Sequence, residues 1–392
     1  MVEIDTDIQT TGGLFATGTV SWDSYEIDTP VKAIPAAKLT KRDTVDEDIR
    51  KIAQVRVKMG PADLEAYRSG NQPQALQNLE KKLSHSIETE VQVVVFEYTD
   101  GHEIGQRDMD TLVEIQNKYA DIITAPCQGE LAEPLMSSID DGRDGMDHSP
   151  FQALRASVEH FKEALTRANI EKPIMGVLPL LSPGHQRQIL TLYEDIGVEF
   201  LAVDFRGKKP TTDEVYEWVQ EFIADLAIRG ELSNYVLYAL NYRKYFSRRN
   251  ATLHPSEALA LVGSGFDVLG ETHISRMGPI GDHEVTNMKV FDPQAFGFRN
   301  VPLDDIQGQW PQASTIEPAR VDGVGDSKRG ALRTLANAES LNYSLRAFRA
   351  AVKNGDVKEF LENKEAASML QEEFQAMIEM YDTACGPSVT GY

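Results

Sequence analysis

The stretch Val91-Gln-Val-Val-Val-Phe-Glu97 is a short apolar run, and a second one, Asp121-Ile-Ile-Thr-Ala-Pro126, follows it. An amphipathic segment over residues 108–119 separates the two runs. Apolar runs of this length are typical of strands buried on both faces, while the spacing of the segment between them is typical of a helix. This strand–helix–strand unit predicts two parallel strands joined by a right-handed crossover.

The same unit recurs along the chain. Further apolar runs that predict strands lie at 173–179, 198–204, 234–240 and 266–270, and runs at 53–59 and 288–292 bring the number of strands to eight. Eight such units predict an α/β protein with a (β/α)8 barrel of the TIM type, whose catalytic groups lie at the carboxyl ends of the strands. An open, doubly wound sheet is the alternative. No strand is followed by a Gly-x-Gly-x-x-Gly turn, so a dinucleotide site has no support.

We expect the barrel to span residues 51–324 and to be flanked by two other segments. Residues 1–50 predict a small, turn-rich β piece, and residues 325–392 predict a helical extension. The apolar positions of that extension recur at i, i+4, i+7 and i+11, namely Leu341, Leu345, Phe348 and Val352. They form one face of a helix, and Asn354-Gly355 predicts its end.

Composition limits the class of protein. The 392 residues contain no apolar run long enough to cross a membrane, and the acidic start lacks the layout of a signal peptide. We therefore expect a cytoplasmic protein without a membrane partner. The cysteines, Cys127 and Cys385, are too few for a disulfide framework or a multi-cysteine zinc site within one chain.

The net charge is −22, from 39 Lys and Arg against 61 Asp and Glu. The acidic residues are spread along the whole chain, so a halophilic adaptation to salty cytoplasm explains this charge better than repulsion of nucleic acid. Binding of nucleic acid needs only a local basic face.

The most concentrated basic segment covers residues 241–250 and follows a predicted strand. Its aromatic and basic side chains are Tyr242, Arg243, Lys244, Tyr245, Phe246, Arg248 and Arg249. Cations for phosphates interleaved with rings for stacking suit a single-stranded or flipped-out nucleotide. The alternative is a solvated loop whose cations pair with the acidic surface.

Four blocks resemble the tRNA-guanine transglycosylase superfamily, in the family's order and across most of the chain. Residues 29–35 are similar to its opening "TP...MPV", 112–124 to "EIVEFQ..IGSDI", 254–267 to "GHPE....AVALGVDLFD", and 333–361 to the closing "HNL" helix that runs into "R.AI..G...EFL". The chain thus resembles a divergent paralogue of this superfamily.

The resemblance implies base exchange, in which a carboxylate attacks C1′ of a guanosine and a deazaguanine base replaces guanine through a covalent intermediate. The implied partners are nucleic acid, either tRNA or DNA, and a 7-deazaguanine-type base, with no cofactor. In the family a His and three cysteines hold a structural zinc. Here Glu339 stands at the His position, so we expect no metal and leave the family's usual dimer open.

The catalytic positions carried over from the family are only partly kept. The counterpart of the "DSGGFQ" loop retains Asp100, whereas the nucleophile of "DLFD" falls on Gly270, with Glu271 beside it and Asp267 at the preceding Asp. The expected catalytic residues are therefore Asp100, Glu271 and Asp267, with Asp100 and Glu271 as the favoured pair. Asp292 is the rival nucleophile in a shifted register.

Other predicted strand ends supply candidates for contacts with the substrate. These are Glu97, Asp204 and Cys127, together with the basic segment, and Glu130 and His273 lie close by in sequence. Cys127 falls where the family has a guanine-binding Asp. With 61 acidic residues, some carboxylates reach any opening by chance, and a lone cysteine is commonly a packed residue.

Two functions follow from these observations. The first is a transglycosylase-like pentosyltransferase that exchanges or processes a guanine-type base. The second is a catalytically inactive paralogue that acts as a binding or assembly module, as the partner of an active transglycosylase. Loss of the guanine-pocket and zinc residues favours the second function, while the basic segment beside strand-end carboxylates favours the first.

Overall fold

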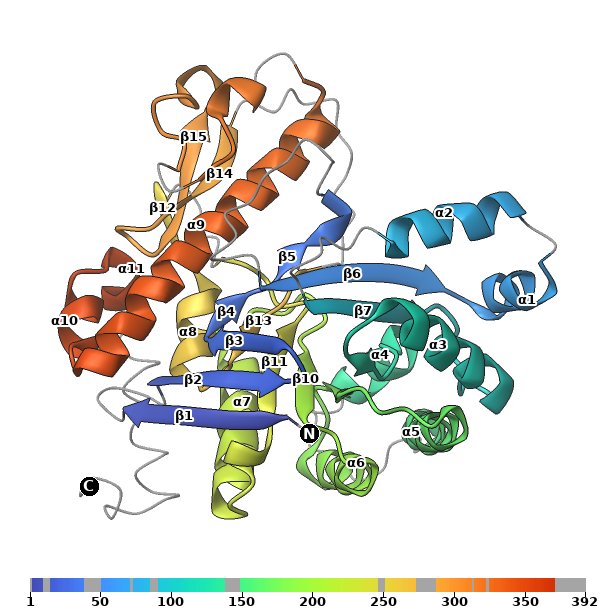
Figure 1. Ribbon diagram of the computed structural model, residues 1–392. Helices are drawn as coiled ribbons and strands as arrows, with labels where there is room; N and C mark the ends of the chain where they lie inside the picture. Colours follow the sequence, from blue (N-terminus) through green and yellow to red (C-terminus); the bar gives the residue numbers. More distant parts are fainter. Residues whose placement is uncertain are drawn as a thin grey trace.

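The computed structural model describes residues 2–9, 15–38, 51–70, 73–84, 91–137, 149–245, 251–272, 287–311, 314–321 and 324–370. The chain is a mixed α/β protein built around a six-stranded parallel sheet (Figure 1). In spatial order the strands are β4 (Val31–Lys32), β13 (Val268–Leu269), β11 (Val236–Leu240), β10 (Phe200–Asp204), β9 (Ile174–Pro179) and β8 (Ile123–Thr124).

A second parallel sheet continues from the first. It contains β5 (Ile34–Pro35), β6 (Ile52–Met59) and β7 (Val91–Tyr98) in that order. Parallel bridges between Val93 and Ile122 and between Glu97 and Cys127 connect β7 to the segment that contains β8. The parallel strands predicted from residues 53–59 and 91–97 are confirmed.

Helices follow the parallel strands, as the repeated strand–helix unit predicts. They are α1 (Pro61–Ser69), α2 (Pro73–Leu83), α3 (Gln106–Tyr119), α4 (Gly129–Ser137), α5 (Ser149–Ala168), α6 (Pro183–Ile196), α7 (Asp213–Ile228) and α8 (Glu257–Gly263). Figure 1 shows α3, α5, α6 and α7 along the outside of the strands. None of the helices described is both long and apolar enough to span a bilayer.

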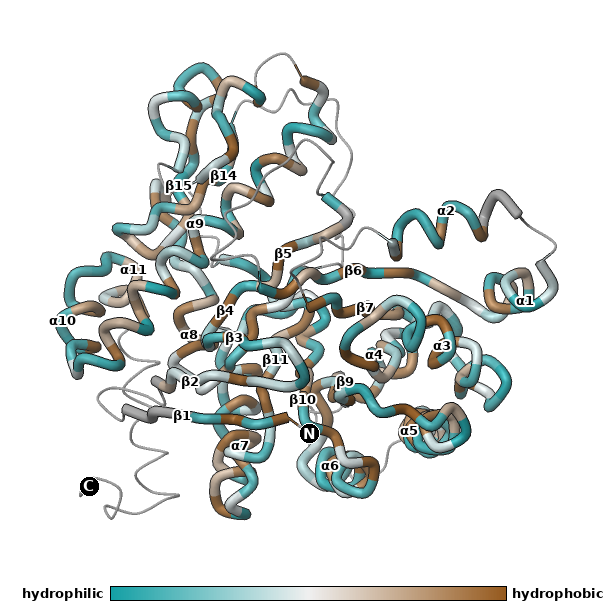
Figure 2. Tube along the Cα trace, in the orientation of Figure 1, coloured by the Kyte–Doolittle hydropathy of each residue, from teal (hydrophilic) through white to brown (hydrophobic). Residues whose placement is uncertain are grey.

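The strands are buried on both faces, which explains their continuous apolar runs. In β10, Leu201 and Val203 belong to the hydrophobic cluster shared with the outer helices, whereas Phe200 and Ala202 belong to the cluster on the other face. Figure 2 shows this concentration of hydrophobic residues along the central strands, with hydrophilic residues on the outer helices. A parallel sheet requires this two-sided burial because its crossovers place helices against it.

Residues 288–292 do not supply a parallel strand, so this part of the prediction is wrong. They belong to β14 (Asn287–Asp292), which pairs antiparallel with β15 (Gly297–Pro302), and β12 (Leu253–Pro255) lies on the other side of β15. The parallel position next to β13 is instead occupied by β4, from residues 1–50. Most of that segment's other strands, β1 (Glu3–Gln9), β2 (Phe15–Trp22) and β3 (Tyr25–Thr29), form an antiparallel sheet.

The C-terminal helix predicted from its apolar stripe is confirmed. It is α9 (Asp326–Asn354), and α10 (Val357–Glu362) and α11 (Glu365–Ser368) follow it. The four stripe residues are buried in the core, and Gly355 ends the helix with a φ of 80°. This is a left-handed conformation that glycine adopts without a steric penalty.

Two polar side chains fasten α9 to distant parts of the chain. Asn342 accepts a hydrogen bond from the backbone N of Lys32 at 2.7 Å and donates one to its carbonyl at 2.9 Å. Glu339 is buried and accepts hydrogen bonds from Ser314 Oγ, Thr315 N and Thr315 Oγ1 at 2.7, 2.8 and 2.7 Å. Glu339 therefore ties a loop to the helix through oxygen contacts. Within the described ranges, no cluster of His, Cys, Asp or Glu could hold a metal ion.

Asp267 offers a test of the packing around β13. The carboxylate accepts hydrogen bonds from Leu237 N at 2.8 Å and Thr29 Oγ1 at 3.2 Å, and burial raises its pKa to about 6. Because this value exceeds the unfolded value of about 3.9, folding favours the protonated form. That stabilisation is complete below about pH 4 and is lost as the pH rises through 6.

We therefore expect Asp267→Asn to remove this pH dependence, since a neutral amide oxygen still accepts from Leu237 N. Between pH 4 and pH 7, the wild type should lose about 2 kcal/mol of unfolding free energy relative to the variant. Chemical denaturation of both proteins at the two pH values measures the difference. Equal pH dependence in the two proteins would contradict the assignment.

Candidate functional site

A buried carboxylate between two lysines lies at the carboxyl ends of β13 and β4. Glu271 Oε1 is 2.5 Å from Lys32 Nζ, and Glu271 Oε2 is 2.7 Å from Lys244 Nζ. The side chains of Lys32 and Glu271 are only 3% and 2% exposed. Lys32 Nζ also donates to the carbonyls of Leu269 and Gly270, at 3.0 and 2.7 Å. The ammonium of Lys32 therefore combines two hydrogen bonds to carbonyl groups with a close ion pair to Glu271.

The charges in this cluster stabilise one another. Burial alone would raise the pKa of Glu271, but the charges of Lys244, Lys32 and Lys38 outweigh burial and hold it well below its usual range. Burial lowers the pKa of Lys32 to about 8, against the attraction of Glu271. At neutral pH both groups are charged. Glu271 is thus a permanent anion that is unsuited to act as a general acid.

Gly270 lies in a space with no room for a side chain. A Cβ there would meet the Tyr238 ring and would lie 2.7 Å from the Ala239 carbonyl oxygen and 3.0 Å from Gln54 Oε1. Gln54 Oε1 is itself held by Tyr238 OH at 2.6 Å and by Glu271 N at 3.1 Å. Position 270, where the resemblance places a nucleophile, therefore has no room for a carboxylate side chain.

A second polar cluster lies at the ends of β10 and β11. Asp204 is buried, and its Oδ1 accepts hydrogen bonds from Asn241 Nδ2 at 2.8 Å and Arg206 N at 3.1 Å. Arg206 and Asn241 both have left-handed backbones, with φ of 51° and 54°. Such conformations carry a steric cost and tend to occur at functional sites. Burial raises the pKa of Asp204, although Asn241 and the charges of Arg206 and Arg56 act in the opposite direction.

The ends of β6, β7 and β8 extend this cluster. Arg56 forms an ion pair with Glu97, and Lys58 Nζ lies 3.8 Å from the same carboxylate. Cys127 is buried, and burial together with the charge of Asp204 raises the pKa of its thiol well above the usual value. A thiol of raised pKa is a poor nucleophile at neutral pH, so a packed residue describes Cys127 better.

The residues expected to be catalytic lie in different surroundings. Asp100 lies beyond β7, where its carboxylate is 3.9 Å from His102 Nε2, a residue whose side chain is 87% exposed. Asp267 precedes β13, so the strand separates it from Glu271 at the other end. Asp292 ends β14 and is bound by Arg299 Nε at 2.6 Å. The structure shows no contact that joins Asp100 to Glu271.

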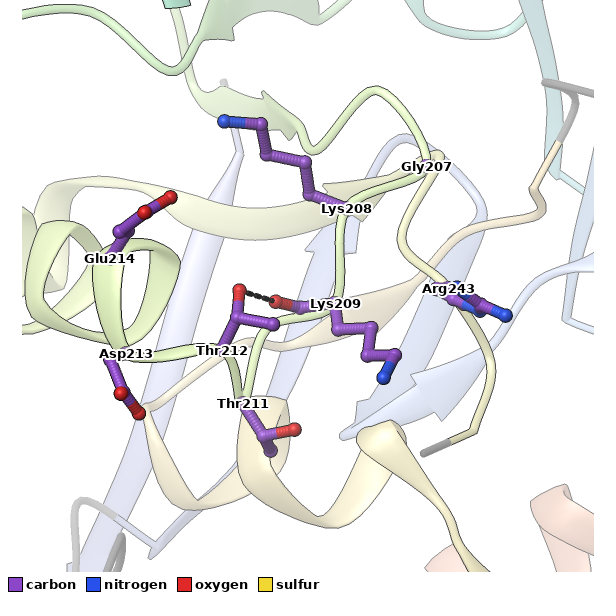
Figure 3. A pocket seen from close by; sticks show the side chains of 8 residues that line it. All are labelled: Gly207, Lys208, Lys209, Thr211, Thr212, Asp213, Glu214 and Arg243. Atoms are coloured by element: carbon purple, nitrogen blue, oxygen red, sulfur yellow. Dashed lines mark hydrogen bonds between the residues drawn. The ribbon is translucent and has the colours of Figure 1, made fainter. Parts of the chain in front are cut away.

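The basic segment is described only as far as Tyr245. Tyr242 is buried in the core, and Lys244 belongs to the Glu271 cluster. Arg243 lines a hollow that is formed mainly by the connection from β10 to α7 (Figure 3). Arg248, Arg249 and His273 lie outside the described residues. Glu130 lies in the first turn of α4 and approaches Gly101, where a Cβ would lie 3.5 Å from its carboxylate.

Several residues of these clusters were not among the candidates predicted from the sequence. Lys32 and Arg56 interrupt otherwise apolar strands, and this interruption is the signal that marks them as inward-facing charges. Arg206 lies two residues beyond the end of a predicted strand, in the region where parallel-sheet proteins place ligand contacts. The partners of these residues come from remote segments.

No protein-family model matches the sequence, and no curated protein is similar to it at a significant level. Among solved structures, the carboxyl transferase domain of Rhizobium etli pyruvate carboxylase, determined with pyruvate, matches with a TM-score of 0.37 and 9% identity. The match covers 92% of this chain and 62% of that chain. A similarity of this size carries no argument about function.

The ion pair of Lys32 and Glu271 should be strongly coupled. Glu271→Gln leaves Lys32 buried without a counter-charge and should lower the free energy of unfolding by about 3–5 kcal/mol. Lys32→Met should have an effect of similar size. The double variant should lose less than the sum of the two, because no buried charge is then left uncompensated.

Urea denaturation of the four proteins measures this coupling. Lys162→Met removes one partner of an exposed pair with Asp195 and serves as the control, with an expected loss below about 1 kcal/mol. Additive losses in the Lys32 and Glu271 variants would contradict the coupling.

Gly270→Ala should destabilise the fold by about 2–4 kcal/mol, because the backbone of Ala239 cannot move away from an added methyl group without disturbing β11. The matched control is Gly184→Ala in α6, where a Cβ meets nothing within 4 Å. This control should be neutral or stabilised by up to about 1 kcal/mol. Melting temperatures of both variants test the difference, and equal values would show that position 270 tolerates a side chain.

Proposed function

We propose that the two parallel sheets form one (β/α)8 barrel of the TIM type. The pairing of β4 with β13 and of β5 with β6 supports this, because only Ala33 separates β4 from β5. The two bridges between β7 and the β8 segment support it at the other junction. Counting β4 and β5 as one strand, every parallel strand then has a neighbour on each side. In this arrangement both polar clusters open at one mouth.

We propose that this mouth binds a guanine-type base of nucleic acid, and that the chain is a transglycosylase-like binding module rather than a base-exchanging enzyme. The observation that carries the proposal is the Asp204 cluster. Asp204 Oδ2 accepts no hydrogen bond from any described residue, so one oxygen of a buried carboxylate is left to meet a ligand. Guanine presents two N–H donors on its pairing edge and acceptors on its other edge, which suit a carboxylate and an arginine.

The surroundings of Glu271 support binding over exchange. Exchange needs a carboxylate free to attack C1′, whereas both oxygens of Glu271 are engaged by lysines. Its neighbour Gly270 has no space for a carboxylate. These contacts favour the inactive-paralogue alternative over the pair of Asp100 and Glu271.

Clustered cations support a nucleic-acid partner. Burial, together with the charges of Arg243 and Arg333, lowers the pKa of Lys289 to about 8. Burial and the charge of Lys244 likewise lower the pKa of Lys38. Neighbouring cations that repel one another create a local positive potential, even in a chain of net charge −22. The phosphates of a nucleic acid would neutralise this potential.

Base exchange centred on Asp204 is the second candidate function. The observation that favours it is the raised pKa of Asp204, which results from burial and brings a carboxyl group closer to the range of a general acid. This candidate requires a nucleophile other than Glu271.

Filter retention of tRNA, duplex DNA and single-stranded oligonucleotides tests the proposal. We expect guanine-containing single strands to be retained best, and Asp204→Asn to weaken their binding by roughly 10- to 100-fold, because an amide N–H group in place of Oδ2 cannot accept a hydrogen bond from a guanine N–H donor. Asp195→Asn, at an exposed site on α6, is the control with the same change of charge and should bind as the wild type does.

Two results would contradict the binding proposal. Retention that is equal in the wild type and in Asp204→Asn would remove Asp204 from the site. Incorporation of labelled guanine by the wild type, lost in Asp204→Asn, would establish the second candidate instead.

A further inference from the structure

A hollow of about 540 Å³ lies beside the Asp204 cluster. Its walls are the connection between β10 and α7, the first turn of α7 and the chain after β11. The lining residues are Gly207, Lys208, Lys209, Thr211, Thr212, Asp213, Glu214 and Arg243 (Figure 3). This volume falls in the range of sites that bind small molecules.

Positive charge collects on part of this hollow. Figure 3 shows Lys209 and Arg243 on the side away from α7, whereas Asp213 and Glu214 lie on the helix opposite. Within the described part of the chain, Lys208 and Arg243 form no ion pair, although both are half-buried. Half-buried cations without an acidic partner favour an anionic ligand.

The hollow is held in shape before any ligand arrives. Arg243 N donates to the carbonyl of Lys208 at 3.0 Å, which fixes the two connections to each other. The buried carboxylate of Glu257 accepts hydrogen bonds from Thr211 N and Thr211 Oγ1, both at 3.0 Å. A preorganised cradle binds with a smaller loss of conformational entropy than a mobile loop does.

Asn241 connects this hollow to the base-binding cluster. Its side chain donates to Asp204, and its carbonyl accepts from Gly207 N at 2.7 Å. The Asp204 cluster and the hollow are therefore adjacent along the segments that follow β10 and β11. The base and the phosphate of one nucleotide are adjacent in the same way. Asp213 and Glu214 supply carboxylates that accept hydrogen bonds from sugar hydroxyls.

We propose that the hollow binds the phosphate of the nucleotide whose base contacts Asp204, with Lys208, Lys209 and Arg243 as its cationic contacts. This inference rests on the proposed function, since it assigns the base to the Asp204 cluster. Arginine binds phosphate through two parallel N–H groups, and lysine adds point charges. The N-terminal end of α7 adds a favourable dipole.

Isothermal titration with guanosine, guanosine 5′-monophosphate, inorganic phosphate and a guanine-centred trinucleotide tests the inference. Titrations are run at the lowest salt concentration at which melting curves show folded protein, because salt screens phosphate contacts. We expect the monophosphate to bind the wild type roughly tenfold or more tightly than guanosine does. Lys208→Ala/Arg243→Ala should abolish this advantage and leave the affinity for guanosine unchanged.

The matched control is Lys118→Ala/Arg155→Ala, which removes the same charge from exposed sites on α3 and α5 and should keep the advantage. Inorganic phosphate should compete with the monophosphate in the wild type and not in Lys208→Ala/Arg243→Ala. A trinucleotide that binds more tightly than the monophosphate would identify an internal phosphate as the source, and the reverse order would identify a terminal one.

Failure of the inference differs from failure of the proposed function. If guanosine binds through Asp204 but the phosphate brings no advantage, or the advantage survives in Lys208→Ala/Arg243→Ala, the phosphate site is overturned alone. If guanosine does not bind and Asp204→Asn changes nothing, the base site is overturned. Phosphate binding that still depends on Lys208 and Arg243 would then support the hollow as an anion site in its own right.

Discussion

The buried ion pair between Lys32 and Glu271 is the contact on which the arrangement of the strands depends. Lys32 lies in β4 near the start of the chain, and its ammonium also binds carbonyls of β13, 237 residues away in the case of Leu269. Neither charge is stable in this environment without the other, because removing either partner leaves an uncompensated ion in a medium of low polarity. The pair therefore favours the one register in which the first and last parallel strands meet.

The same ion pair limits the chemistry that is available at the carboxyl ends of β4 and β13. Lys32 and Lys244 occupy both oxygens of Glu271, so this carboxylate supports the fold and is not free to react. The packed ring of Tyr238 against Gly270 removes the neighbouring position as well. At the carboxyl end of β10, by contrast, Asp204 Oδ2 accepts no hydrogen bond from the described residues. The proposals for a base site and a phosphate site both rest on this difference between Glu271 and Asp204.

The C-terminal helix α9 is attached by hydrogen bonds that require no metal. Asn342 pairs with both backbone groups of Lys32, so the helix contacts the same strand that carries the central ion pair. Glu339 binds Ser314 and Thr315 where the resemblance to transglycosylases places a zinc ligand. A buried carboxylate with three donors satisfies its lone pairs and joins helix to loop as a metal would.

The sequence by itself determined the elements with strong local periodicity. The apolar runs at 91–97 and 198–204 became buried parallel strands, and the stripe from Leu341 to Val352 became the buried face of α9. Tertiary structure alone decided which segments pair. The two-residue strand β4 is too short to carry a period, and residues 288–292 have the composition of a strand but pair antiparallel. The tertiary structure also places Asp267 and Glu271 at opposite ends of β13. It alone brings Lys32, Arg56 and Arg206 to their charged partners from remote segments. Local sequence patterns predict which residues are buried. Which strands pair depends on contacts between residues up to hundreds of positions apart, and the periodicity of the sequence contains no information about them.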